Sequence, residues 1–238
     1  MSVILHIETA TEGCSVCVSQ DGANIFNTDN FEDLKSASKK ETNHSKRLGV
    51  FVDEAMSFTD SHAIPFDAVA VSSGPGSYTG LRIGVSMAKG ICYGQNLKLI
   101  SVPTLEILCV PVLLRYDDLP EDALVCPMLD ARRMEVFTAL YTRALRPVIE
   151  TAPMVIDEHS FAEQLDKHPI YFFGNGAEKC KSVITHPNAH FIDGIELNAK
   201  YMAPLAEKKF LREEFEDVAY FEPFYLKEFV AIKAKKLL

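Results

Sequence analysis

Apolar and polar positions at the start of the chain follow a strand pattern. Residues 3–7 form an apolar run that ends in Glu8, the chain turns through residues 9–13, and residues 14–18 return as an alternating run. Short apolar or alternating runs bounded by turn residues are typical of β-strands. The pattern predicts a hairpin with a carboxylate at its turn.

The same pattern recurs near the middle of the chain. Residues 124–129 are apolar and end in Asp130, a turn follows, and residues 136–141 return as a second strand. The recurrence favours two copies of one α/β unit, although two common motifs can also coincide by chance.

Each half also contains an apolar strand that runs into a glycine loop. Residues 67–72 lead into Gly74-Pro75-Gly76, and residues 170–173 lead into Gly174-Asn175-Gly176. Glycines at the end of a strand are typical of a tight turn into a helix. These loops strengthen the interpretation of a duplicated α/β architecture.

Two long helices are predicted in the first half. Residues 43–58 carry apolar side chains at three-to-four spacing, which is the pattern of an amphipathic helix. Residues 79–94 carry a stripe of small residues at positions 80, 84 and 88, which permits a neighbouring element to approach closely. Further helices are predicted at residues 161–165, 177–184 and 199–211, and a last one after Pro223.

Composition narrows the class of protein. The 238 residues form one large domain or two modest ones. No apolar run reaches the ~20 residues of a membrane span, and the first residues lack the features of a signal peptide, so we expect a cytoplasmic protein without membrane contact. The six cysteines indicate reduced core thiols, and the Cys14/Cys17 pair lies on opposite faces of a strand, which disfavours a metal or redox site.

Charge disfavours nucleic acid as a direct ligand. The 24 Lys and Arg against 33 Asp and Glu leave a net charge of -9, which repels a polyphosphate. The C-terminal residues are the exception, with a local excess of cations that indicates either a basic patch or a solvated helix face. The charged residues of this segment are Lys227, Lys233, Lys235 and Lys236, against Glu228.

The loop of residues 73–80 is the first candidate for chemistry. It lies between a strand and a helix, where backbone amides favour an anion, but Leu81-Arg82 follows where a phosphate-binding P-loop has Lys and Ser or Thr. A phosphate cradle and a tight turn for helix packing are both open. Two interpretations are also open for the hairpin acids: they hold a magnesium nucleotide, or they only shape their turns. The candidate nucleotide or phosphate residues are Glu8, Thr9, Gly74, Gly76, Ser77 and Asp130.

His186 and His190 are a second, weaker candidate. Their spacing would place two imidazoles on one face of a helix. Pro187 lies between them and an apolar run follows, so a surface loop is the interpretation that the pattern favours.

Four stretches together resemble a known family. They are residues 7–16, the segment Ser73–Gly84 with the letters SGPGSYTGLRIG, residues 129–132 and the segment 222–226 with the letters EPFYL. In this order they resemble the TsaB (YeaZ) family of tRNA threonylcarbamoyladenosine (t6A) biosynthesis proteins, which is related to glycoprotease-like M22 peptidase homologues. The resemblance spans nearly the whole chain, and its glycine stretch is the most specific part.

This resemblance implies an α/β fold of the actin-like ATPase (ASKHA, ribonuclease H-like) type with two duplicated domains. The implied division is residues 1–108 for a first domain with the partner-binding helices, 109–221 for a second domain, and 222–238 for a C-terminal helix that packs back on the first. The implied function is that of a non-catalytic scaffold subunit of the machinery that makes t6A in tRNAs reading ANN codons. It would bind and activate a catalytic TsaD-like subunit together with a TsaE-like ATPase, and it would reach tRNA only through the complex.

The resemblance also implies that this chain lacks the metal ligands of the catalytic relative. The two metal-binding histidines of the catalytic relative align with Thr104 and Leu108, and neither side chain replaces an imidazole. We therefore expect no catalytic metal. Glu8 stands where the superfamily usually has Asp, which weakens the case for a nucleotide on this chain alone. The expectation is no cofactor for the isolated chain, with ATP or ADP and magnesium at the interface of the complex.

The two long helices are expected to form the partner face by the same resemblance. An exposed ridge of Leu48, Phe51 and Val52 beside a groove at Gly80, Gly84 and Ala88 would suit helix docking, and the same surface would support a homodimer of the isolated chain. Gly84→Leu is then expected to block docking and leave the fold intact. The expected interface residues are His44, Leu48, Phe51, Val52, Ala55, Gly80, Arg82, Ile83, Gly84, Met87 and Ala88.

Two other functions stay open at this point. The glycine loops and hairpin acids suit an ATP-dependent kinase or ATPase of the same superfamily, and the family grouping suits a glycoprotease-like metallopeptidase. Micromolar binding of Mg-ATP by the isolated chain would favour the first, and stoichiometric zinc or iron would favour the second.

Overall fold

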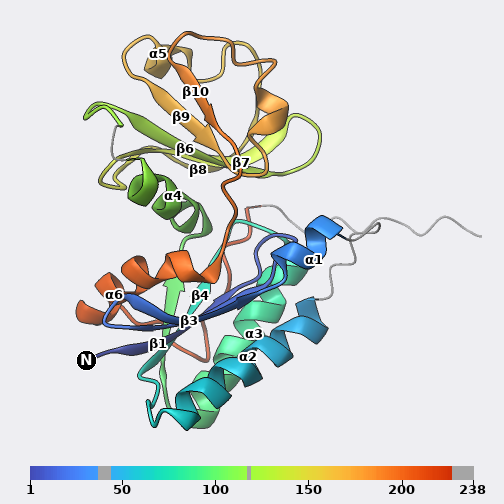
Figure 1. Cartoon of the computed structure of the whole chain (residues 1–238). Helices are drawn as coiled ribbons and strands as arrows, with labels where there is room; N and C mark the ends of the chain where they lie inside the picture. The colour runs from blue at the N-terminus through green and yellow to red at the C-terminus, as the bar shows by residue number, and fades with distance from the viewer. Residues whose placement is uncertain (37–43, 117–118, 227–238) are drawn as a thin grey trace, which may run out of the picture.

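The computed structural model describes residues 1–36, 44–116 and 119–226. Two α/β units lie one above the other in Figure 1, with the N-terminus in the lower unit. No helix among the described residues is long and apolar enough to cross a membrane.

The first unit is built on a five-stranded sheet in the order β3-β2-β1-β4-β5. Strand β1 pairs antiparallel with β2 and parallel with β4, and every residue of β1 and β4 is buried. Strands covered on both faces read as continuous apolar runs, which is why both strands were recognisable in the sequence. The strands are β1 (Val3–Glu8), β2 (Ser15–Gln20), β3 (Ala23–Asp29), β4 (Ala68–Ser72) and β5 (Lys98–Val102).

The second unit repeats this topology. Its sheet has the order β8-β7-β6-β9-β10, with β6 antiparallel to β7 and parallel to β9. The equivalence of the two sheets, strand for strand, confirms the duplicated α/β fold that the hairpin pattern predicted. The strands are β6 (Leu124–Asp130), β7 (Glu135–Thr142), β8 (Pro147–Val155), β9 (Ile170–Phe173) and β10 (Ala189–Ile192).

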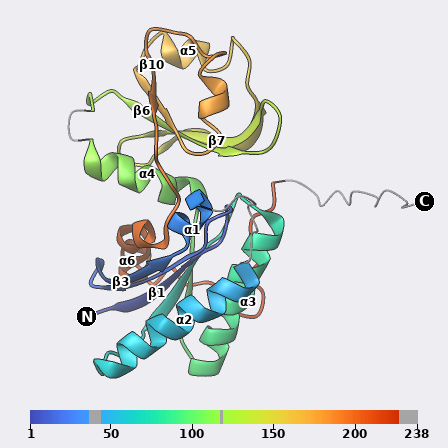
Figure 2. The same cartoon turned by 45° about the vertical axis from the view of Figure 1, so that its right-hand side comes forward.

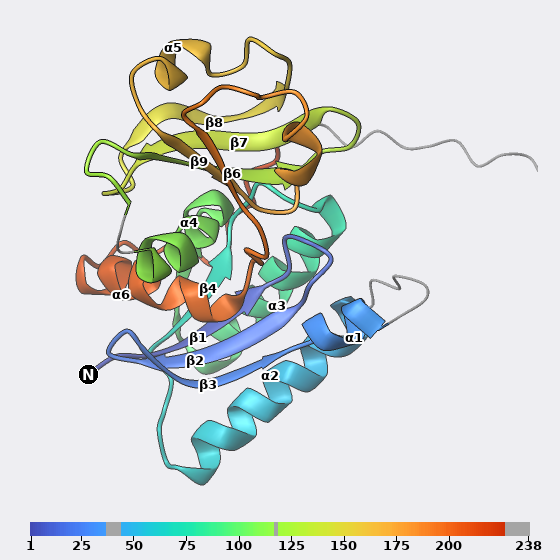
Figure 3. The same cartoon turned by 45° about the horizontal axis from the view of Figure 1, so that its top comes forward.

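Helices cover both faces of each sheet. Helices α2 and α3 pack on one face of the first sheet, while α6 and the 3-10 helix η2 pack on the other (Figures 1 and 3). Helix α4 lies between the two units and contacts both β6 and η2. The helices are α1 (Phe31–Ser36), α2 (His44–Ser61), α3 (Tyr78–Gln95), α4 (Thr104–Arg115), α5 (Ala162–Leu165), α6 (Ala203–Leu211), η1 (Glu178–Cys180) and η2 (Ala199–Met202).

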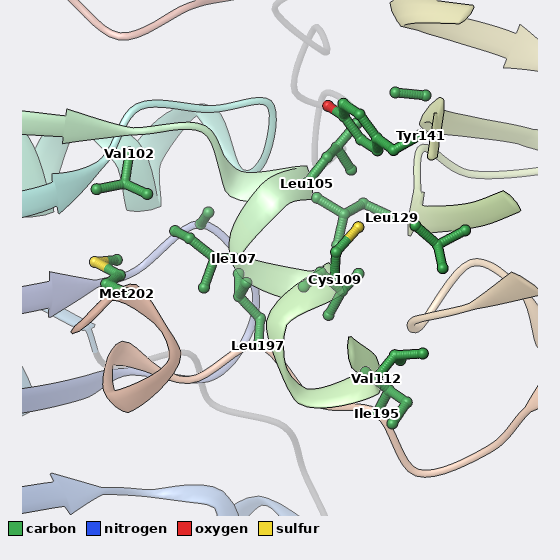
Figure 4. Packing of buried hydrophobic residues seen from close by; sticks show 14 of the residues in the cluster. Val102, Leu105, Ile107, Cys109, Val112, Leu129, Tyr141, Ile195, Leu197 and Met202 are labelled. Carbon is green, nitrogen blue, oxygen red and sulfur yellow. The ribbon is translucent and has the colours of Figure 1, made fainter. Parts of the chain in front are cut away.

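Helix α4 is the centre of a hydrophobic core that belongs to both units. It is apolar on nearly all sides, which is the pattern of a helix buried all round. Figure 4 shows side chains of this helix between Val102 and Met202 on one side and Leu129 and Tyr141 on the other. Two further cores lie under α2 and α3 and on the outer face of the second sheet.

The chain crosses back to the first unit after β10, as Figure 2 shows. Helix α6 contacts β1, β3 and β5, and Glu216 pairs with Leu99 beside β5. The expected boundaries therefore differ from the structure, because residues 199–221 pack on the first sheet and not with a domain 109–221. The expected boundary at 108 also falls inside the continuous helix α4.

One predicted helix is largely wrong. Of residues 177–184, only the three residues of η1 are helical. Cys180 and Ile184 are buried beneath the second sheet, and Pro187 and strand β10 follow closely, so the segment packs as successive turns. The predicted C-terminal helix lies outside the described residues beyond residue 226.

Candidate functional site

The glycine loop donates its backbone amides to the chain itself. The amide of Ser77 donates to the carbonyl oxygen of Ala10 at 2.7 Å, and the amide of Gly74 donates to Thr104 Oγ1 at 3.1 Å. Ser77 caps α3, because its Oγ accepts a hydrogen bond from the Gly80 amide at 3.2 Å. These donors would have to be released before the loop could bind a phosphate through them.

The turn after β1 fills the space beside the glycines. A Cβ at Gly76 would clash with Ala10, and a Cβ at Gly80 or Gly84 would clash with Thr9. Thr9 Oγ1 also donates to the carbonyl oxygen of Gly80 at 2.8 Å. The packing interpretation of the loop is therefore the one that the contacts support. Residues 9 and 10, together with the loop and the start of α3, are called the glycine-loop junction below.

Glu8 is buried at this junction, with 1% of its surface exposed. Its Oε1 accepts from the amide of Ala10 at 2.5 Å. Its Oε2 and the Oγ of neighbouring Ser72 are buried and make no hydrogen bond of normal geometry with any described residue. Burial raises the pKa of Glu8 to about 7, against the opposing effect of the Ala10 amide.

Asp130 lies in a different environment. Its side chain is 46% exposed and forms an ion pair with Lys179, while its Oδ1 accepts from the Arg132 amide at 3.0 Å. The Asp130 amide donates to Asn175 Oδ1 at 2.9 Å. The two hairpin acids therefore have different surroundings, because Glu8 is buried whereas Asp130 is partly exposed and paired with a lysine. A cavity of about 280 Å³ lies between the two units, and neither acid is among the described residues that line it.

The positions aligned with metal-binding histidines do not fit a metal. Thr104 is buried, and its Oγ1 already accepts from the Gly74 amide. Leu108 is buried in the shared core, against Gly174. A hydrocarbon side chain offers no ligand atom. Within residues 1–36, 44–116 and 119–226, no group of three His, Cys, Asp or Glu side chains could hold a metal ion.

The weaker candidates are explained by packing. Cys14 and Cys17 are buried in the first sheet, and burial raises the pKa of each thiol to about 12, which keeps them protonated. His190 stacks on Tyr171 in the second sheet, whereas His186 lies in the preceding loop, 3.5 Å from Asp166. The two histidines therefore do not share a helix face.

The expected docking ridge on α2 is wrong, because its residues face the protein interior. Leu48, Phe51, Val52 and Ala55 are buried and belong to the core between α2 and the first sheet. An amphipathic helix buries its apolar stripe against the nearest sheet, and this requirement explains the spacing. His44 is the first residue of α2, and its side chain lies outside the described part of the chain.

The expected groove on α3 is likewise internal. Gly80 and Gly84 pack against Thr9, and Ala88 is buried in the same core as the ridge. Gly84→Leu would therefore damage the fold, contrary to the expectation. Of the predicted interface residues on α3, Arg82 is exposed, and Ile83 and Met87 are partly buried.

A second stripe of small residues lies on the outside of α3. Ser86, Gly90 and Gly94 are exposed and follow the same i, i+4 spacing, and no atom of the described residues lies within 4 Å of a Cβ built at either glycine. Together with Arg82, Ile83 and Met87 they line an open groove, called the α3 outer groove below. The spacing was readable in the sequence. The sequence alone does not show which of the two stripes faces the core. The burial of Val85, Ala88 and Cys92 shows that it is the inner one.

The segment after α6 accepts hydrogen bonds from α3. Lys89 Nζ donates to the carbonyl oxygens of Ala219 and Phe221, at 3.0 and 3.1 Å. The Phe224 amide donates to the carbonyl oxygen of Ser73 at 2.7 Å. The Tyr225 ring lies 4.9 Å from that of Tyr78, over which the Arg82 guanidinium lies at 4.5 Å. The EPFYL stretch thus ties the C-terminal segment to the glycine-loop junction.

Several known proteins match this chain in sequence or in structure. Residues 38–235 match the family model described as TsaD: tRNA N6-adenosine threonylcarbamoyltransferase. The chain is 30% identical to the tRNA threonylcarbamoyladenosine biosynthesis protein TsaB of Escherichia coli, over 97% of this chain and 96% of that one. It is 25% identical to the protein of the same name from Haemophilus influenzae, over 97% and 95%. The structure of YeaZ from Pseudomonas aeruginosa has the same fold, with a TM-score of 0.75, 23% identity, and coverage of 95% of this chain and 100% of that one.

The two stripes on α3 predict opposite effects of the same substitution. Gly84→Leu should lower the free energy of unfolding by about 3 kcal/mol or more, because the side chain must displace the Thr9 turn. Gly90→Leu should raise it by about 0.5–1 kcal/mol, because leucine is the better helix former and meets open space. Urea unfolding followed by circular dichroism measures both. Equal stability of the two variants would contradict the assignment of inner and outer faces.

The buried carboxyl of Glu8 predicts a pH-dependent difference from Glu8→Gln. The pKa of Glu8 is raised from 4.5 to about 7, so the folded protein holds a proton that the unfolded chain releases in this window. The stability of the unsubstituted protein should therefore fall, relative to Glu8→Gln, as the pH rises from 4.5 to 7, by roughly 3 kcal/mol in total.

The measurement is urea unfolding of both proteins across this pH range. Burial lowers the pKa of His6 to about 3, so His6 makes stability rise with pH up to its unfolded pKa near 6.5. His6 is present in both proteins, and its contribution cancels in the difference. If the stability curves of the two proteins run parallel over this pH range, the Glu8 carboxyl does not have a raised pKa in the folded protein.

Proposed function

The chain belongs to the TsaB (YeaZ) family of tRNA threonylcarbamoyladenosine biosynthesis proteins, and on this premise we propose that it serves t6A formation as a binding subunit without a reactive centre of its own. Its task is to hold a related transferase subunit in its working conformation. The observation that carries the proposal is the packing of residues 9 and 10 into the glycine loop.

The filled junction supports a binding role. In a phosphate-binding loop, the amides at the helix N-terminus must be directed at the ligand. Here the amides of Ser77 and Gly74 donate to Ala10 and Thr104, and the neighbouring carboxyl of Glu8 is buried. A phosphate would have to replace these contacts and also overcome the cost of placing its charge beside Glu8.

The side chains at positions 104 and 108 support the same role. The related transferase would need ligand atoms here, and this chain has a hydroxyl that already accepts a hydrogen bond and a leucine in the core. A metallopeptidase or a metal-dependent transferase activity of the chain alone has no set of residues to support it within the described part. The same contacts count against an ATP-dependent kinase.

The partner surface that we propose is the α3 outer groove with the exposed side of α2. The small residues Ser86, Gly90 and Gly94 allow a helix of another protein to approach α3 closely, and Ile83 and Met87 supply apolar contact. The occupant is a helix of the TsaD-like subunit, and a second copy of this chain occupies the groove when that subunit is absent. This placement keeps helices α2 and α3 as the interface but replaces their inward-facing residues.

The remaining partners that we propose follow from the family membership and from the net charge of the chain. A TsaE-like ATPase would act on the assembled complex. The net charge of -9 favours contact with tRNA through the partner and not through this chain alone. The proposal places the protein in the cytoplasm, with the tRNA that the complex modifies.

Depletion of the protein should lower the t6A content of bulk tRNA, measured by mass spectrometry of nucleosides. The unsubstituted gene should restore it, because the binding subunit is again supplied. Undiminished t6A after complete depletion would contradict a role in this pathway. A control nucleoside made by an unrelated enzyme should remain constant throughout.

Gly90→Leu should fold normally and lose the partner, because its side chain fills the α3 outer groove. We expect its affinity for the co-expressed TsaD-like subunit to fall by about tenfold or more, and t6A to remain low after complementation. Ala144→Leu, at an exposed turn of the second unit, adds bulk away from the groove and should behave like the unsubstituted protein. Co-purification of Gly90→Leu at the normal yield would refute this placement of the interface.

A further inference from the structure

Asn175 and Gly176 form the single Asn-Gly pair of the sequence. They lie in the loop 174–176 that follows β9, called the second glycine loop below. Asparagine is chemically labile, and glycine after it favours loss of the side-chain amide, because the next backbone nitrogen attacks the side-chain carbonyl carbon and glycine places no side chain in the way. Asn175 is exposed, so water reaches it. The pair is therefore a candidate site of covalent modification.

Packing explains why the chain has this reactive pair. A Cβ at position 176 would lie 2.9 Å from the carbonyl carbon of Leu129 and 3.0 Å from the backbone nitrogen of Asp130, so the loop has no room for a side chain there. Asn175 Oδ1 accepts a hydrogen bond from the Asp130 amide at 2.9 Å. Each of the two residues has a structural role, and the reactive order of residues follows from both roles together.

The same contacts hold the two reacting groups. The Gly176 amide donates to the carbonyl oxygen of Met128 at 3.0 Å, so its nitrogen is not free to attack. The Asn175 carboxamide is fixed by the Asp130 amide. Met128 and Asp130 both belong to the end of β6, which therefore holds the attacking nitrogen and its target at once. The reaction requires the second glycine loop to leave β6.

We propose that Asn175 is a deamidation site whose rate is set by local opening of the second glycine loop. In the open loop, the Gly176 nitrogen forms a bond to Cγ of Asn175, and the bond from Cγ to Nδ2 breaks. The leaving group takes up the proton from the Gly176 nitrogen and departs as ammonia. Water then adds to either carbonyl group of the cyclic imide and reopens the ring, which gives aspartate or isoaspartate at position 175.

The two products act differently on the fold. Aspartate keeps an oxygen that accepts from the Asp130 amide, but it adds a negative charge beside the ion pair of Asp130 with Lys179. Isoaspartate adds a methylene group to the main chain. Gly174 lies against Leu108 so closely that a Cβ would clash, and the lengthened loop cannot keep this contact. Because Leu108 belongs to the core that joins the two units, isoaspartate should loosen that core.

Mass spectrometry of proteolytic peptides measures the conversion of Asn175 in the full chain at neutral pH. The chain unfolded in guanidinium chloride should convert at Asn175, and the folded chain should convert about tenfold or more slowly, because its loop must first open. Asn188 and Asn198, each followed by alanine, are internal controls that should stay unchanged over the same time. Equal rates in the folded and unfolded chain would overturn the proposal, and so would an unchanged Asn175 in the unfolded chain.

Two matched valine truncations separate opening of the loop from unfolding of the whole chain. Val136 Cγ1 lies 3.0 Å from the place of a Cβ at Gly176, so Val136→Ala removes a side chain that packs on the loop. Val16 is the equivalent second residue of β2 in the first sheet and is as fully buried. With both variants brought to the same free energy of unfolding by a little denaturant, Val136→Ala should convert about threefold or more faster than Val16→Ala. Equal rates would mean that global unfolding controls the reaction, and would refute local opening.

The converted protein gives a second readout. Anion exchange separates it by its added negative charge, and the isoaspartate form should unfold at a lower urea concentration than Asn175→Asp, which has the same charge without the extra methylene group. Equal unfolding midpoints of these two proteins would contradict the tight packing of the second glycine loop. These measurements involve neither tRNA nor a partner, so their outcome is independent of the proposed function.

Discussion

The packing of Thr9 and Ala10 into the glycine loop is the contact on which the first unit depends. Gly76, Gly80 and Gly84 have no side chains, and the turn after β1 lies in the space that side chains would fill. The turn therefore fixes the distance between β1 and α3, and Ser77 can both cap α3 and donate its amide to Ala10. The same contact uses the Ser77 amide, which a phosphate at the start of α3 would need as a donor. A tight strand-to-helix junction and an open phosphate loop are alternatives here, and this chain has the tight junction.

Helix α3 carries two stripes of small residues with different surroundings. The inner stripe at Gly80, Gly84 and Ala88 allows the β1 turn to approach. The outer stripe at Ser86, Gly90 and Gly94 leaves an open groove on the surface. Each glycine in a helix costs about 1 kcal/mol relative to alanine. The inner glycines are offset by contacts within the fold, whereas the outer ones have no such contact with the residues that the structure describes, which is consistent with a role in binding another protein.

The sequence was sufficient for the architecture and insufficient for deciding which faces of the helices are buried. Strands β1, β4, β6 and β9 are apolar runs ending in turn residues, and duplicated hairpins made the two-unit fold predictable. Periodicity also placed α2 and α3 almost correctly. It could not say which face of α2 is covered, because a ridge such as Leu48, Phe51 and Val52 looks the same whether a sheet or a partner covers it.

Long-range packing explains the other differences. The return of residues 199–221 to the first sheet depends on contacts with strands far earlier in the chain, such as the pairing of Glu216 with Leu99. No local pattern encodes them. The short helix η1 follows from burial of Cys180 and Ile184 under the second sheet, which a helical spacing alone did not reveal. Glu8 was recognisable as a hairpin acid, but its burial beside Ser72 required the packed structure.

The core around α4 argues that the two units hold a fixed arrangement. Proteins that close around a nucleotide need a cleft whose walls separate, and a large hydrophobic interface between two units opposes this motion. Here one continuous cluster includes Ile100 of the first sheet, Val125 of the second and Met202 of the return segment, with Leu105 and Leu108 of α4 between them (Figure 4). Opening the units would expose these side chains to water, at a cost of roughly 25 cal/mol for each Å² of apolar surface. Leu108 is one of the buried residues of the core that keeps the units together. Two units that share one core are suited to presenting a constant surface to another protein.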